Sequence, residues 1–427
     1  MALPFPYDRL PSQYFESYGA RGTTVSRRPA SAALIRAVND RLGLDLLVAN
    51  GPLSRTEMAQ LTGLSKPTVA ELLDRLLEAE LIEDLGETDS GRPGPNARRY
   101  GIPRGLAYVA GAQVRGDSVR AAIADITGRQ VGEATVWADP DRQPVHVVHR
   151  AITSAIADSG IDADRLHGAV VGMPGFIDPR SGEVAIDWDL PERHRGVPDK
   201  LRADLGRPAV FENDINLAAV AEYRLGAAQD TDMFALLDFG QGVGLAVVLG
   251  GQLHRGANGG AGEIGYMPVP GAGFGPIGTP GTPYSGGLQA YVGAEAIVAV
   301  AREHGIETVN GTGVNAARAG AVAAVEAAHT VEGGNGFLDA LAYRMAVGAA
   351  SVCSVLDPGF IVLTGAVARA GGEELATRVA RELAEVSPLR TQVVLSALPQ
   401  GAALRGAILV ALDAAHDAIF GSASPGA

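Results

Sequence analysis

The sequence predicts an α/β protein made of a small winged helix-turn-helix domain and a larger body with two similar lobes. Three observations predict this organisation. A pair of short, capped helical segments lies at 53–79, a hairpin rich in Gly, Pro and Arg follows it, and from about Leu106 strand–turn–strand openings alternate with helices and occur twice. A chain of 427 residues is also too long for one compact domain. We expect a flexible N-terminal arm at 1–30, the winged domain at 31–104 and the body at 105–427.

The helical pair has recognisable start and stop signals. Ser54 is a typical helix cap, and a first helix is expected over Arg55–Leu61. Gly63 can take the positive φ that ends this helix. Ser65 is a second cap, and Pro67 is tolerated in the first turn of the next helix. That second helix places its apolar residues on one buried stripe, at Val69, Leu72, Leu73, Leu76 and Leu77.

The opposite face of the second helix carries short polar and basic side chains, of the kind that contact phosphates and base edges. The following segment, 86–100, has the flexible and cationic composition of a DNA-binding wing. Two ordinary packed helices would show the same capping, but the wing favours DNA binding. The residues expected to contact DNA are Arg55, Ser65, Lys66, Thr68, Arg75, Arg92 and Arg98.

The charge is unevenly distributed along the chain. Residues 1–104 hold 13 Lys and Arg against 13 Asp and Glu, so residues 105–427 carry the whole net charge of −13. A neutral DNA-binding segment on an acidic body should bind random DNA weakly and depend on a dimer for its affinity. Cys353 is the single cysteine, which excludes an internal disulfide and a cysteine metal cluster. No targeting or membrane-spanning segment is recognised, so a cytoplasmic location is expected.

The body alternates strands and helices in two similar series, which predicts two lobes at about 105–228 (joined by a C-terminal helix) and about 229–400. A cleft between such lobes is the expected ligand site. The expected strands are 108–113, 119–125, 133–137, 168–172, 209–211, 233–238, 243–249 and 360–364. The expected helices are 31–49 in the winged domain, then 145–158, 214–225, several from 288 to about 356, and further helices to the end.

After the winged helix, the body carries four ordered motifs, which read VVGMPGFIDPRSGEV, FENDINLAAVAEYRLG, LDFGQGVGLAVVLGGQLHRGANGGAGEIGYMPV and IVLTGAVARAG. These motifs resemble those of the ROK family of repressors, open reading frames and sugar kinases. The resemblance implies an actin-like ATPase fold for the body, with a sugar bound between the lobes. It further implies that members with an N-terminal winged helix regulate carbohydrate genes, whereas members without it are sugar kinases.

The resemblance also identifies candidate sugar-binding residues. Asn213 and Asp214 match the family's Asn-Asp pair, in which the Asp is the catalytic base of the kinases, and Glu263 matches its Glu-x-Gly-His motif. Carboxylates accept hydrogen bonds from vicinal hydroxyls, and an amide both donates and accepts. The Asn-Asp pair also fits simple helix capping, which can coexist with binding. A family Glu becomes Gln289 and the family His becomes Tyr266, so the ligand need not be glucose or N-acetylglucosamine.

Other positions depart from the kinase pattern. Gln113 stands where the resemblance places the metal-binding and phosphate-binding Asp, and a neutral amide is a poor ligand for Mg²⁺. Arg115 and Asp117 replace small residues beside the phosphates, although the second glycine loop at 240–244 keeps its shape. The family's zinc ligands are replaced by residues that cannot form a tetrahedral zinc site, namely Tyr266, Pro280, Thr282 and Gly287. We therefore expect no cofactor, no bound zinc and no phosphoryl transfer.

These observations predict a sugar-responsive transcriptional repressor that binds a double-stranded operator as a homodimer or homotetramer, without a membrane. An ATP-dependent sugar kinase with an added DNA-binding domain is the alternative, favoured by Asp214 and opposed by Gln113 and the missing zinc site. A DNA-binding architectural protein without a ligand is disfavoured because Asn213, Asp214 and Glu263 are retained.

Overall fold

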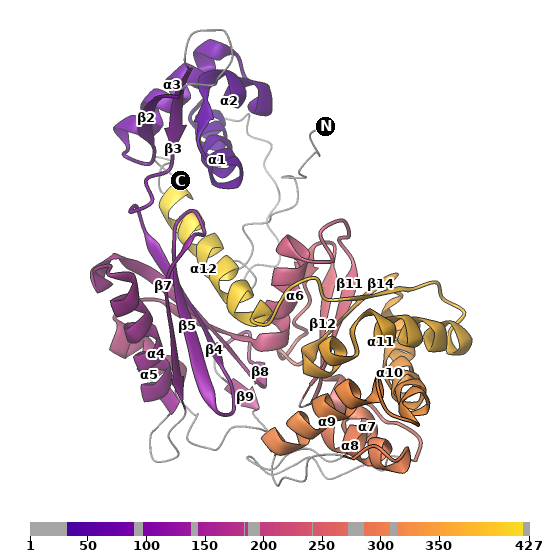
Figure 1. Cartoon of the computed structure of the whole chain (residues 1–427). Helices are drawn as coiled ribbons and strands as arrows, with labels where there is room; N and C mark the ends of the chain where they lie inside the picture. The colour runs from indigo at the N-terminus through magenta and orange to yellow at the C-terminus, as the bar shows by residue number, and fades with distance from the viewer. Residues whose placement is uncertain are drawn as a thin grey trace.

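The winged domain lies above a two-lobed body in the computed structural model (Figure 1). The structure describes residues 32–88, 97–137, 144–182, 184–186, 197–240, 242–271, 286–307 and 314–421. The expected N-terminal arm and Arg92 of the expected wing lie outside these residues.

The winged domain has the elements that the capping signals predict. They are α1 (Ala32–Asn50), β1 (Leu53–Ser54), α2 (Arg55–Thr62), α3 (Lys66–Glu78), β2 (Glu83–Thr88) and β3 (Ala97–Gly101). Ser54 Oγ accepts from the Glu57 N–H at 3.3 Å while the Glu57 carboxylate accepts from the Ser54 N–H at 2.8 Å, a reciprocal cap that begins α2. Gly63 ends α2 at φ 70°. The three strands form an antiparallel sheet in the order β1-β3-β2.

The first lobe contains a five-stranded sheet in the order β10-β7-β4-β5-β6. Strands β4 to β6 are antiparallel, and β7 and β10 run parallel to β4. Helices α4 and α5 pack beside this sheet, and α12 also packs against it. The bounds are β4 (Tyr108–Val114), β5 (Ser118–Asp125), β6 (Gln130–Trp137), α4 (Pro144–Ser159), β7 (Leu166–Met173), α5 (Val197–Leu205), β10 (Ala209–Asn213), α6 (Asp214–Leu225) and α12 (Ala402–Gly421). A small sheet pairs β8 (Phe176–Ile177) with β9 (Val184–Ile186).

The second lobe repeats this design in the order β13-β12-β11-β14-β15, with three antiparallel strands followed by two parallel ones. Its bounds are β11 (Phe234–Phe239), β12 (Val243–Leu249), β13 (Gln252–Leu253), α7 (Gly287–Val292), α8 (Ala294–Glu303), α9 (Val314–Ala328), α10 (Gly334–Leu356), β14 (Phe360–Thr364), α11 (Gly365–Val386) and β15 (Gln392–Leu395). The prediction of helices alone after Thr364 is wrong at β15. This edge strand of four residues has too little length to show a periodic signal.

Helix α10 is long and apolar enough to cross a membrane by length and composition, although no such segment is expected from the sequence. Half of its most apolar window is buried inside the protein. Its apolar residues, including Phe337 and Met345, pack into the core of the second lobe with β11, α8 and α11. Cys353 lies in the same helix and is buried. These contacts give α10 the position of a core helix.

Helices α6 and α12 lie at the junction of the lobes (Figure 1). One face of α6 contributes Ala218 and Ala219 to the core beneath the second sheet, while Leu217 and Val220 join a cluster with α12. Gly406 of α12 makes this crossing close, because a Cβ there would meet the Leu217 carbonyl oxygen at 1.9 Å. The hydrophobic cluster around α12 extends without interruption into the winged domain.

Candidate functional site

The first turn of α3 presents a small polar surface. Ser65 Oγ accepts from the Thr68 N–H at 3.3 Å and lies 2.8 Å from the Thr68 hydroxyl, which fixes the start of the helix. Lys66 beside them is exposed. Beyond this turn the exposed side chains of α3 include Glu71 and Asp74, and their negative charge opposes phosphate. Within α3, the polar and basic surface expected to contact DNA is therefore confined to the first turn.

The sequence predicts that Arg75 contacts DNA from this surface, but in the structure its guanidinium is paired with a carboxylate of α1. Its Nε and Nη2 donate to the two carboxylate oxygens of buried Asp40, at 3.1 and 2.5 Å. This hydrogen-bonded contact with Asp40 raises the pKa of Arg75. Arg75 thus fastens α3 to α1, and Asp40 supplies the negative charge that a DNA phosphate would otherwise provide.

Two other predicted DNA contacts stay near the surface. Arg55 lies 3.7 Å from Asp74 and 5.6 Å above the Tyr100 ring, with about half of its side chain exposed. Arg98 on β3 pairs with Asp84 at 2.9 Å, and its side chain is 64% exposed. Exposed ion pairs of this kind contribute little to stability. Both arginines can therefore exchange their carboxylate partner for a phosphate at small cost.

A small cavity lies where α6 begins, between the lobes. Asn213 and Glu263 line it together with Asn216, Gly244 and Gly262. Its volume is about 30 Å³, the space of roughly one water molecule. The structure thus brings two of the predicted ligand residues, Asn213 and Glu263, together around one small cavity.

Asn213 is a helix cap as well as a cavity residue. Its Oδ1 accepts from the Ile215 and Asn216 N–H groups at 2.9 and 3.1 Å, and its Nδ2 donates to the Gly175 carbonyl at 2.8 Å. The capping interpretation of the Asn-Asp pair is confirmed. The amide is already oriented by three protein contacts before any ligand arrives.

The sequence interpretation missed an ion pair between the lobes beside this cavity. Glu212 at the end of β10 accepts from Arg255 Nε at 2.7 Å, and Arg255 follows β13 in the second lobe. The other Glu212 oxygen accepts from the Asn216 side chain and the Asn213 N–H, each at 2.9 Å. The position of Glu212, directly before Asn213 and Asp214, is the feature of the sequence that could have indicated this pair. The pair thus links the two lobes beside the cavity.

Three carboxyl groups near the start of α6 have raised pKa values, those of Asp214, Asp238 and Glu263. Burial, and then the neighbouring Asp238, raise the pKa of Asp214 to about 7. Burial raises the pKa of Asp238 to about 6, and the charges of Arg369 and Arg318 oppose this effect. Burial also raises the pKa of Glu263 and lowers that of Arg115, which lies near Arg318. At neutral pH a fraction of the molecules therefore has Asp214 or Asp238 protonated.

The Asp214→Asn variant should be more stable than the parent protein at pH 8. The folded-state pKa of Asp214 is raised from 3.8 to about 7, so the folded protein favours the neutral carboxyl group. The stability that this protonation contributes is complete below pH 3.8 and is lost as the pH rises through about 7, whereas Asn stays neutral at every pH. The gain should be on the order of 2 kcal/mol at pH 8, several degrees in Tm, and should shrink toward pH 5. Thermal melts at pH 5, 6.5 and 8 measure it, with exposed Asp230→Asn as control. A gain that is equal at all three pH values would contradict this account.

Asp238 occupies space between two glycine loops. A Cβ built on Gly240 would lie 3.0 Å from Asp238 Oδ1, and one built on Gly365, at the start of α11, would lie 2.9 Å from it. In the kinases that the sequence resembles, such loops handle nucleotide phosphates. A carboxylate in this place fills the volume and repels the charge of a phosphate.

Two predicted ligand residues lie beside the cavity rather than on it. Gln289 Oε1 accepts from the Val243 N–H at 2.9 Å, so this side chain holds the second glycine loop. Tyr266 ends a short 3₁₀ turn, Ile264–Tyr266, directly after Glu263. Neither lines the 30 Å³ cavity in this arrangement. Pro280 and Thr282, two of the expected zinc-ligand replacements, lie outside the described residues.

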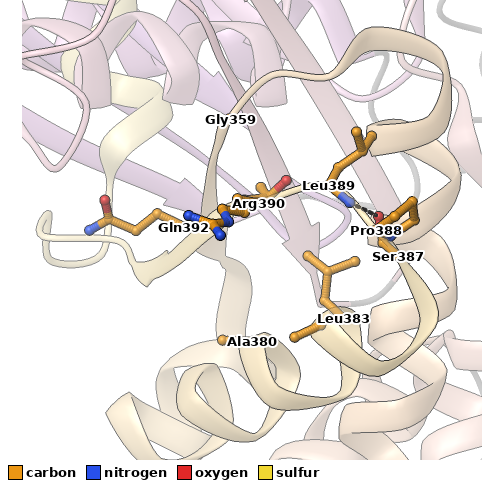
Figure 2. A pocket seen from close by; sticks show the side chains of 10 residues that line it. Gly359, Ala380, Leu383, Ser387, Pro388, Leu389, Arg390 and Gln392 are labelled. Atoms are coloured by element: carbon orange, nitrogen blue, oxygen red, sulfur yellow. Dashed lines mark hydrogen bonds between the residues drawn. The ribbon is translucent and has the colours of Figure 1, made fainter.

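A larger groove lies at the other end of the second lobe (Figure 2). Its volume is about 560 Å³, and its lining includes Gly359, Leu383, Ser387, Arg390 and Gln392. Gly359 precedes β14 whereas Thr364 ends it, so this groove and the glycine loops lie at opposite ends of that strand. None of the residues predicted from the sequence lines it.

A winged helix docked on a two-lobed α/β body defines a class of proteins that join a DNA-binding fold to a sugar-kinase-like body. The chain belongs to the ROK family, whose sequence profile matches residues 109–414. A profile described as winged helix-turn-helix DNA-binding matches residues 44–83.

Individual relatives include both regulators and kinases. The chain is 24% identical over 246 residues to the xylose repressor of Bacillus subtilis (strain 168), covering 56% of this chain and 62% of the relative. It is 29% identical over 211 residues to a glucokinase of Halalkalibacterium halodurans, covering 48% and 63%. These matches span about three-fifths of the relatives' lengths. A solved ROK family transcriptional regulator, described as a homolog of the E. coli MLC protein, shares the fold with a TM-score of 0.70 at 18% identity, over 92% of this chain and 100% of that one.

Proposed function

We propose that the protein is a sugar-responsive transcriptional repressor of carbohydrate genes that acts in the cytoplasm as a homodimer or homotetramer. The observation that carries the proposal is the joint presence of an exposed polar turn at the start of α3 and a polar cavity between the lobes. The similarity to the xylose repressor supports it. The winged helix binds the operator, and a sugar in the cleft lowers the affinity for it.

A movement of the lobes gives this response a physical basis. Asn213 and Glu263 line a narrow cavity between the lobes, and we propose that a sugar binds there when the lobes move apart. A ligand that binds the open arrangement better than the closed one shifts the population toward the open form. The same difference in affinity lowers the affinity for DNA if DNA prefers the closed form. The Glu212–Arg255 pair lies across this movement and favours the closed form.

Lys66→Ala and Thr68→Ala should each weaken operator binding. A lost base-edge contact costs about 1–3 kcal/mol and relaxes sequence preference, whereas a lost phosphate contact weakens all sequences alike and reduces the salt dependence. Titrations at several salt concentrations, on DNA selected from a random library by the parent protein, measure both effects. Arg150→Ala, at an exposed position of α4 in the body, is the control and should bind as the parent does. Unchanged binding by both α3 variants would refute the assignment of this surface.

The alternative function, an ATP-dependent sugar kinase, has one observation in its favour. A pKa of about 7 suits Asp214 to act as a general base near neutral pH. Phosphoryl transfer also needs a metal held at the phosphates and room for them. Gln113 supplies no charge for a metal, and Asp238 occupies the space between the glycine loops.

ADP release in the presence of Mg-ATP and D-glucose, D-xylose or N-acetyl-D-glucosamine should therefore stay at background. A coupled enzyme assay measures it, with Asp214→Asn as the control that defines background. Sustained turnover by the parent protein that disappears in Asp214→Asn would establish the kinase instead.

A further inference from the structure

The end of α6 is fastened to α12 by a forked ion pair. Arg224 Nη1 and Nη2 donate to the two carboxylate oxygens of Asp413, at 2.8 and 2.6 Å. The two side chains are only 22% and 25% exposed. Such two-pronged pairs fix orientation as well as distance. Because α6 begins at the cavity with Asn213 and Asp214, a displacement at the cavity reaches α12 through this pair.

One helical turn later, α12 is fastened to the winged domain. Asp417 accepts from Arg41 of α1 at 2.9 Å, and Arg41 also pairs with Asp45 at 2.9 Å. The Arg41 guanidinium lies 6.0 Å from the Phe420 ring centre, a cation–π contact. Residues 413 and 417 are four apart, so they share one face of α12.

Aromatic packing holds the end of α12 in place. The His416 and Phe420 rings stack with centres 5.0 Å apart, and Phe420 is fully buried. His416 Nε2 lies 2.8 Å from the carbonyl oxygen of Ile126, which follows β5. The end of α12 is therefore clamped between the first lobe and α1, and it has little freedom to absorb a displacement locally.

From α1 the contacts continue to the helix that presents Lys66. Asp40, the neighbour of Arg41, accepts from Arg75 of α3 at 2.5 and 3.1 Å. Leu44 and Leu47 of α1 pack in one cluster with Leu72 and Leu76 of α3. The cavity and the DNA-contacting turn are thus joined by four helices, α6, α12, α1 and α3, and three charged pairs fix each helix to the next.

We propose that α12 couples the cleft to the winged domain, and that Asp413 and Asp417 are the positioning residues of this coupling. The inference rests on the proposed function for its biological meaning. Opening of the cleft displaces α6, the Arg224–Asp413 pair carries the displacement to α12, and the Arg41–Asp417 pair turns α1 and α3 relative to the body.

The first test needs neither sugar nor DNA. In Asp413→Asn, hydrogen exchange of α1 and α3 amides should be about tenfold faster than in the parent, because the clamp on α1 is loosened. Amides of α10 in the second lobe should be unchanged. The matched control is Asp339→Asn, which removes the acceptor of Arg378 (2.6 Å) and Arg381 (2.8 Å) in the second lobe and should leave α1 as it is. Unchanged exchange of α1 in Asp413→Asn would overturn the proposal.

Asp417→Asn is the second variant, and it tests the coupling in the opposite direction, from the winged domain to α6. Coupling between two sites is reciprocal, so this change beside α1 should speed exchange in α6. If Asp413→Asn does not fold, protection of α6 that is equal in Asp417→Asn and in the parent overturns the proposal by itself.

An experiment with added sugars tests this inference separately from the proposed function. D-xylose, D-glucose and N-acetyl-D-glucosamine are each added to the parent protein on its selected DNA. Failure of all three to release DNA counts against sugar regulation, while the exchange experiment still decides the coupling. If one sugar releases the parent, Asp413→Asn should still bind that sugar in a thermal-shift assay but lose most of the release. Full release in Asp413→Asn would overturn the coupling and leave the regulator intact.

Discussion

Glu263→Ala should abolish the response of operator binding to sugar while leaving operator binding without sugar unchanged. Glu263 lines the small cavity with Asn213, and its burial raises the pKa of its carboxyl group. Removing a buried acceptor leaves ligand hydroxyls unpaired, which costs about 1–3 kcal/mol, or roughly ten- to a hundredfold in sugar affinity. The winged domain lies apart from the cavity, so the DNA contacts are preserved. Operator titration of both proteins, with and without the effective sugar, is the measurement.

Glu295→Ala provides the matched control for this experiment. It also removes one carboxylate of the second lobe, at an exposed position in the first turn of α8. It should respond to sugar as the parent does. If Glu263→Ala also responds fully, the effector site lies away from this cavity.

Arg75→Met should weaken binding to every DNA sequence by destabilising the winged domain. The change leaves Asp40 buried without its partner, and loss of one partner of a largely buried pair costs about 2–4 kcal/mol. The expected result is a lower unfolding temperature and lower DNA affinity with an unchanged salt slope. A phosphate contact would give the opposite pattern, in which the salt slope falls by about one and the unfolding temperature stays the same.

Two further variants make this test specific. Asp40→Leu combined with Arg75→Met should recover much of the lost stability, since an apolar pair leaves no buried charge. Arg98→Gln should lower the salt slope without destabilising the fold, because the Arg98–Asp84 pair is exposed. Failure of the double variant to recover stability would show that Arg75 acts otherwise than through Asp40.

Local rules allowed much of the fold to be predicted. Ser54, Gly63 and Ser65 define the helix pair through contacts with residues three or four positions away, and α6 begins and ends where the sequence predicts. The stripe of apolar residues on α3 is buried as expected. Period and capping are properties of neighbouring residues, so a single sequence contains them.

The departures arise from partners that are distant along the chain. Arg75 lies 35 positions from Asp40, and nothing near Arg75 in sequence shows that its charge is already used. Asp238 meets Gly365 only because β11 and β14 are adjacent in the sheet. Gln289 holds Val243 across 46 positions. In each case the residue type was informative, but its partner was set by the packing of the lobes.

The docking of α1 on α12 also has a consequence for synthesis. The two helices share one hydrophobic cluster, yet α1 ends at Asn50 and α12 begins at Ala402. At 5–20 residues per second, the ribosome completes α1 roughly 20–70 s before α12 emerges. During this interval the apolar residues of α1 that pack in this cluster are not yet covered by α12. A nascent chain can therefore display its winged helix on the polysome well before that domain is seated on the body that would regulate it.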